Sequence, residues 1–73
     1  MKLSDTTLKI MNKTWIFDLK LLYYFCLNQT PPILKESPYT NEQYYQLLDY
    51  CIAHNKVYGD LSEEEEKEAT SNG

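Results

Sequence analysis

SPYTNEQYYQLLDYCIAHN, residues Ser37 to Asn55, is the stretch that decides the fold, because it carries a helix start, an apolar face and a helix end. Thr40 followed by Gln43 forms a capping box, in which each side chain bonds to the free backbone N–H of the other residue. Apolar side chains then recur at the three- and four-residue spacing of one helical face: Tyr44, Leu47, Leu48, Cys51 and Ile52. The stretch therefore predicts a helix whose apolar stripe packs against another element.

The segment Leu19 to Leu27, LKLLYYFCL, predicts a second helix that is apolar almost all round. Asp18 stands at its N-cap position, while Asn28 and the prolines Pro31 and Pro32 end it. A helix that is apolar on two faces is expected to be sandwiched between other elements. The proline-containing connector should then bring the helix described above back across it.

Residues 1–5 are expected to be frayed. The segment from Thr6 to Phe17, TTLKIMNKTWIF, contains two runs of strand-favouring residues on either side of Asn12 and Lys13. Asn tolerates the left-handed conformation that a two-residue turn requires, so the segment predicts a short β-hairpin. The alternative is one helix through the whole segment, which its β-branched and aromatic content disfavours.

The C-terminal segment, residues 61–73, reads LSEEEEKEATSNG and has no apolar face. Ser62 and Glu65 repeat the capping-box pattern, which makes transient helix plausible, but the composition predicts a disordered acidic tail. The predicted fold is therefore a small α+β domain over residues 6–60, with the hairpin packed on two helices and the tail at 61–73.

The length of 73 residues allows one small core, which leaves little room for a catalytic constellation with its own supporting residues. We therefore expect no enzyme activity and no cofactor. The chain has seven lysines, no arginine and a net charge of −4. Because arginine supplies the bidentate contacts that read bases and clamp phosphates, this composition argues against sequence-specific nucleic-acid binding.

Cys26 and Cys51 are interpreted as reduced, buried thiols, since the polar segment from Met1 to Thr7 does not resemble a signal peptide. Cys51 and His54 fall on one helical face, but a structural zinc site needs four ligands, so we predict no metal site. No apolar run is long enough to span a membrane. A cytoplasmic monomer is expected.

The chain contains seven Tyr, one Trp and two Phe, which is more than one small core can hold. Tyr24, Tyr45 and Tyr50 lie off the predicted apolar stripes and are candidates for anchors at a protein interface. The first twenty residues are net positive, whereas five glutamates lie between Glu63 and Glu68. The predicted partner-binding residues are Lys9, Lys13, Trp15, Tyr24, Tyr45 and Tyr50. Stacking on single-stranded bases is the alternative use of these rings.

In its length, its many aromatic residues, its lack of arginine, its acidic tail and its lack of an enzymatic motif, the whole chain resembles small bacteriophage-encoded regulators that bind bacterial RNA polymerase, of the Xanthomonas phage type. The resemblance implies a host-cytoplasmic protein that binds the N-terminal region of the largest polymerase subunit. It further implies inhibition of transcription initiation and of intrinsic termination, with a weak contact to nascent RNA.

Two other functions are consistent with the sequence. An acidic nucleic-acid mimic could inhibit a host nuclease or repair enzyme, but five of the eleven acidic residues lie in the predicted tail. A small DNA-binding regulator could use the two predicted helices as a helix-turn-helix, although the proline-rich connector and the missing arginines disfavour that arrangement.

Overall fold

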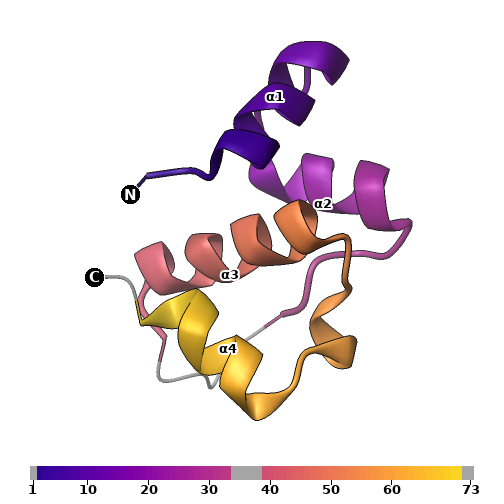
Figure 1. The fold of residues 1–73 in the computed structure, drawn as a ribbon. Helices are drawn as coiled ribbons and strands as arrows, with labels where there is room; N and C mark the ends of the chain where they lie inside the picture. Colours follow the sequence, from indigo (N-terminus) through magenta and orange to yellow (C-terminus); the bar gives the residue numbers. More distant parts are fainter. Residues whose placement is uncertain (1, 34–38, 72–73) are drawn as a thin grey trace.

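Helix α3 (Asn41–His54) runs through the middle of the computed structural model, which describes residues 2–33 and 39–71. Helices α1 (Asp5–Thr14) and α2 (Leu19–Leu27) lie on one side of α3, and both contact it (Figure 1). Within the described residues all regular structure is helical and there is no strand. The fold is therefore all-α, and the prediction of an α+β class is wrong.

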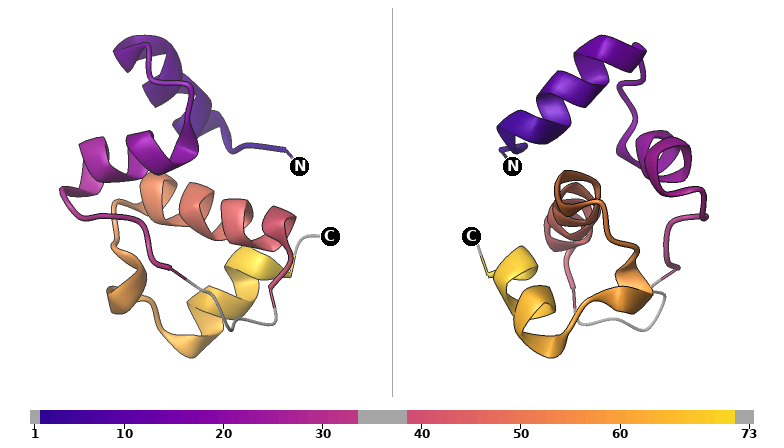
Figure 2. Two further views of the ribbon diagram at one scale, coloured as in Figure 1. Left: turned by 180° about the vertical axis from the view of Figure 1, so that it is seen from behind. Right: turned by 45° about the vertical axis from the view of Figure 1, so that its right-hand side comes forward.

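The 3-10 turn η1 (Tyr58–Asp60) follows α3 and leads into α4 (Glu63–Thr70), which packs on α3 on the side away from α1 and α2. Figure 2 shows this order from two further directions, with α3 between the N-terminal helices and α4. Every other helix thus contacts α3.

The ends of α2 and α3 agree with the sequence analysis. Asp18 caps α2 by accepting a hydrogen bond from the backbone N–H of Lys20, and the capping box of Thr40 and Gln43 is formed in both directions. Asn28 and Asn55 end the two helices in the left-handed conformation, which asparagine tolerates better than most residues.

The predicted hairpin at residues 6–17 is replaced by helix α1, because contacts with α3 favour the helix over local strand propensity. Ser4 caps α1 and also donates two hydrogen bonds to the Asp49 carboxylate, one from its backbone N–H at 3.2 Å and one from its hydroxyl at 3.1 Å. The hydroxyl of the fully buried Thr7 donates to the Asp49 backbone carbonyl at 3.4 Å. Tertiary contacts of this kind routinely override residue propensity.

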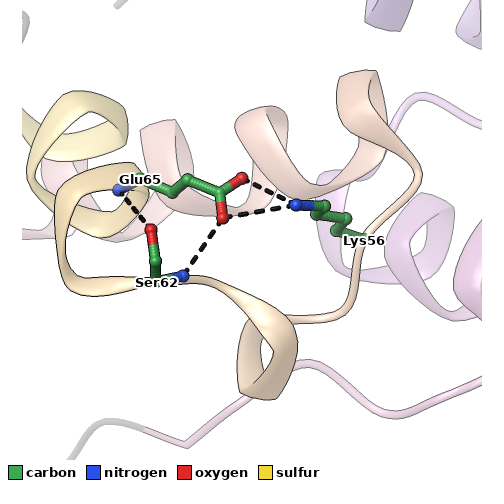
Figure 3. Close-up of polar contacts among 3 residues, drawn as sticks. All are labelled: Lys56, Ser62 and Glu65. Carbon is green, nitrogen blue, oxygen red and sulfur yellow. Dashed lines mark hydrogen bonds and ion pairs between the residues drawn. The ribbon is translucent and has the colours of Figure 1, made fainter.

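The predicted disorder from residue 61 is also wrong where α4 forms. Ser62 and Glu65 make a complete capping box, and the Glu65 carboxylate additionally accepts from Lys56 Nζ at 3.0 Å (Figure 3). The next glutamate, Glu66, accepts hydrogen bonds from the hydroxyls of Tyr39 at 2.8 Å and Tyr58 at 2.7 Å. These polar contacts, together with the buried Ala69, dock a helix that has no apolar stripe.

The core lies between α3 and the first two helices. Its buried members come from all three elements: Met11, Leu22, Tyr23, Leu48, Cys51 and Ile52. Leu47 is also fully buried, and helical spacing places it on the same side of α3 as Gln43, whose amide donates to the Thr70 carbonyl on α4. Leu47 and Gln43 thus lie on the side of α3 that faces α4.

Candidate protein-binding surface

Helix α2 buries only one of its two apolar faces. Leu22 and Tyr23 point into the core, whereas Leu21 and Phe25 are 61% and 62% exposed. Together with Tyr24 they share the outer face of α2, because they are three and four residues apart. The prediction that α2 is sandwiched between other elements is therefore wrong, because the described residues cover only its inner face.

The connection between α1 and α2 also exposes aromatic side chains. Trp15, at the end of α1, is 81% exposed, and Phe17 is also largely exposed. We call the set that follows the aromatic surface: Trp15, Phe17, Leu21, Tyr24 and Phe25. A fully buried aromatic ring covers about 150–250 Å², so these side chains expose roughly 500 Å² of largely apolar area.

Trp15 holds an unfavourable backbone conformation. It ends α1 with φ at 62°, in the left-handed region that glycine and asparagine adopt at low cost. Among the described residues, the other two non-glycine positions with positive φ, Asn28 and Asn55, are both asparagines. A bulky residue pays about 1–3 kcal/mol for such a conformation, and an exposed indole gains little packing in return. The backbone conformation of Trp15 therefore lowers the stability of the fold, and its ring faces solvent.

Lysines border the aromatic surface on both sides of the connection. Lys13 lies at the end of α1 and is exposed, and Lys20 lies in the first turn of α2, with its ammonium 5.9 Å from the centre of the Tyr44 ring. Asp18, the carboxylate between them in sequence, accepts the capping hydrogen bond of α2. The surface thus combines apolar side chains with a basic border.

The structure brings together only part of the predicted partner-binding set. Trp15 and Tyr24 belong to the aromatic surface, and Lys9 and Lys13 are exposed on α1. Tyr45 is half-buried against the core. Its ring is in edge contact with the ring of Tyr44, and the two ring centroids are 5.5 Å apart.

Tyr50 lies away from the aromatic surface and is half-buried beside α4. Its ring packs on the imidazole of His54, with the two ring centroids 4.1 Å apart. Tyr45 and Tyr50 therefore pack against other rings of this chain and lie outside the aromatic surface. The predicted set lacks Phe17, Leu21 and Phe25, because a sandwiched α2 would have covered Leu21 and Phe25. Leu21 and Phe25 could have been predicted as surface residues from the second apolar face of α2, which a core on one side of the helix leaves exposed.

An apolar groove adjoins the aromatic surface. It lies between the inner side of α1 and the C-terminal parts of α2 and α3, with a volume of about 770 Å³. Its lining includes Ile10, Lys13, Phe25, Cys26 and Ile52. Phe25 belongs to both features, so the groove and the aromatic surface are continuous.

A smaller and more polar cleft of about 240 Å³ lies between the start of α1, α3 and α4. Asp49, Tyr50, His54 and Glu68 contribute to its lining. The Asp49 carboxylate is already engaged by Ser4, as described above. In the described part of the chain, no three His, Cys, Asp or Glu side chains are grouped so that they could hold a metal ion.

The two cysteines differ in access. Cys51 is fully buried, and this burial raises the pKa of its thiol to about 12, while Cys26 is half-buried and its pKa is also raised by burial. His54 is exposed and packs on Tyr50, so its imidazole and the Cys51 thiol lie in different environments.

Comparison with known proteins found no match to the chain among protein-family models, curated proteins or solved structures. None of the helices in the described ranges combines the length and the apolar character that crossing a membrane requires.

Proposed function

We propose that this chain is a non-catalytic regulator that binds a larger protein through the aromatic surface. The observation that carries the proposal is the outer face of α2, where Leu21, Tyr24 and Phe25 are exposed on a helix with one charged residue in nine. Large exposed apolar patches mark interaction sites, and Trp and Tyr are the residues most enriched among interface hot spots.

The partner we propose is bacterial RNA polymerase, in the cytoplasm of the host bacterium. This choice is supported by the resemblance in length and general character to phage-encoded polymerase-binding regulators. In this proposal, the chain contacts the N-terminal region of the largest subunit and thereby hinders initiation and intrinsic termination. Lys9 and Lys13 would meet acidic groups of the enzyme or phosphates of the nascent RNA.

Charge supports a defined orientation on the partner. Lys9, Lys13 and Lys20 lie on α1 and α2, whereas the exposed glutamates Glu63 and Glu64 lie on α4, on the opposite side of α3 (Figure 1). Complementary potentials steer association and suppress misoriented encounters. The lysines of α1 and α2 would then face an acidic rim around an apolar site on the partner.

The two alternative functions receive less support. A helix-turn-helix places its second helix, here α3, in the DNA groove, but α3 lies at the centre of the fold in contact with α1, α2 and α4. The connection between α2 and α3 spans residues 28–40, longer than the turn of three to four residues in that motif. A nucleic-acid mimic would need free carboxylates, yet Glu65 and Glu66 are engaged within the chain.

The experiment is a direct binding measurement between the full-length chain and purified bacterial RNA polymerase. Replacing Leu21 and Tyr24 together by Ser should weaken binding by about tenfold or more, because hot-spot side chains dominate interface energies. Ile33→Ser is the matched control, since Ile33 is 79% exposed but lies outside the aromatic surface.

A polymerase that does not bind the wild-type chain would reject this partner. Equal binding by the double variant and the control would reject the aromatic surface. If binding is found, transcription from a promoter and read-through of an intrinsic terminator should both respond to the wild-type chain and less to the double variant.

A further inference from the structure

The apolar groove between α1, α2 and α3 is an open concavity with a volume of about 770 Å³. On α1 it is lined by Thr6, Ile10, Lys13 and Thr14, which lie on one helical stripe. A stripe of this kind, facing two further helix ends, gives the groove an elongated wall.

The uncharged polar residues of the lining are Thr6, Thr14 and Asn55, and one of them already has a partner within the chain. The hydroxyl of Thr14 donates to the Ile10 carbonyl at 2.7 Å, so this hydrogen bond is already made within α1. Lys13 is the sole charged side chain of the lining, and no carboxylate in the described ranges is within ion-pair distance of it. The groove is therefore apolar with one uncompensated positive charge.

From this combination we infer that the groove receives an amphipathic helix of the protein partner, whose apolar side chains insert beside Ile10, Cys26 and Ile52 and whose carboxylate pairs with Lys13. The inference rests on the proposed protein-binding function and specifies the part of the partner that is recognised. An amphipathic helix docks its apolar face into such a groove, and the charge at the rim fixes its register. The continuity through Phe25 adds the aromatic surface to the same contact.

The test uses two labelled helical peptides of about 15 residues with the same leucine stripe, one carrying glutamates and one lysines at the flanking positions. The wild-type chain should prefer the glutamate peptide by about tenfold, as expected for a close charge pair at an interface. Lys13→Glu should reverse this preference. Lys67→Glu, the same charge change on α4, should keep the wild-type preference.

Two further measurements locate the peptide. Methyl resonances of Ile10 and Ile52 should shift on titration, while those of Leu47, on the α4 side, should not. Saturating glutamate peptide should also slow labelling of Cys26 by a thiol reagent. Ala53→Leu, which extends a half-buried lining residue into the groove, should abolish all three effects.

The inference is overturned if neither peptide binds saturably, if Lys13→Glu leaves the preference unchanged, or if the shifts fall outside the groove. Its failure can be separated from failure of the proposed function. Polymerase binding that is lost in the Leu21 and Tyr24 double variant but kept in Ala53→Leu would reject the groove alone.

Discussion

The phenol oxygen of Tyr23 accepts a hydrogen bond from the backbone N–H of Tyr58 at 2.8 Å, which ties the core of α2 to the start of η1. Tyr23 is 1% exposed, and desolvation raises the pKa of its hydroxyl despite the opposing effect of this hydrogen bond. A buried tyrosine thus positions the segment that leads into α4.

The Tyr23–Tyr58 contact predicts a specific loss of stability. Tyr23→Phe would leave the Tyr58 N–H without its acceptor, at a cost of about 1–2 kcal/mol in the free energy of unfolding. Tyr24→Phe is the control, because the neighbouring ring is 54% exposed and no stability change is expected. Urea denaturation followed by circular dichroism measures both. Equal stability of the two variants would show that water replaces the lost acceptor.

Removing α4 should destabilise the rest of the fold. A chain that ends at Asp60 loses the helix that packs beside Leu47 and the hydrogen bonds to Glu66 from Tyr39 and Tyr58. Exposure of one large apolar side chain alone costs about 1.5–3 kcal/mol. The truncated chain should therefore unfold at lower urea concentration than the full-length chain. Unchanged stability would mean that α4 contributes no net docking energy.

Replacing Trp15 should raise the stability of the fold and weaken binding to the partner. Trp15→Gly removes the strain of a positive φ and should raise the free energy of unfolding by about 1 kcal/mol, while removing an exposed ring from the aromatic surface. Asn55→Gly, at a position with φ of 54°, is the matched control and should change stability by only a few tenths of a kcal/mol, because asparagine already tolerates this region. Denaturation and polymerase binding are measured on the same samples. A destabilised Trp15→Gly would show that the indole contributes packing.

Acidification should weaken the contacts at the start of α4. The Ser62 backbone N–H and then Lys56 lower the pKa of the Glu65 carboxyl below its usual 4.5. A carboxyl with a lowered folded-state pKa stabilises the fold above its unfolded pKa, and this contribution is lost as the pH falls through the folded value. We expect Glu65→Gln to flatten the decline in stability of the wild-type chain below pH 4.5.

Glu64→Gln is the control for this pH dependence. Glu64 is an exposed neighbour on the same helix, so this variant should decline with pH as the wild-type chain does. Denaturation curves across the acidic range compare the three proteins. A Glu65→Gln profile that coincides with the wild type would contradict the linkage to Glu65.

Local signals were sufficient to predict α2 and α3. Asp18, Thr40, Asn28 and Asn55 act through bonds to residues within a few positions, and such signals are visible in the sequence. The start of α1 carries a local signal too, since the Ser4 hydroxyl accepts from the Thr7 N–H, but the strand-favouring residues that follow outweighed it and led to the prediction of a hairpin. The contact between Ser4 and Asp49, 45 positions away, is not visible in the sequence.

Long-range contacts also explain the missed helix α4. Glu66 is held by Tyr39, which is 27 positions away, and a string of glutamates gives no sign that one of them has such a partner. For the candidate surface, the sequence identified Trp15 and Tyr24 as rings outside the core. It could not show which face of α2 would stay uncovered, because that depends on how α1 and α3 pack.

Because the other helices pack on α3, the core cannot be completed during synthesis until α3 has been made. Helices α1 and α2 end at Thr14 and Leu27, and both leave the ribosome before α3, which begins at Asn41. Until α3 has emerged, Leu22 and Tyr23 have no core to enter, and both faces of α2 are open to solvent. A nascent chain that stalls before His54 therefore presents an apolar helix of the kind that chaperones bind.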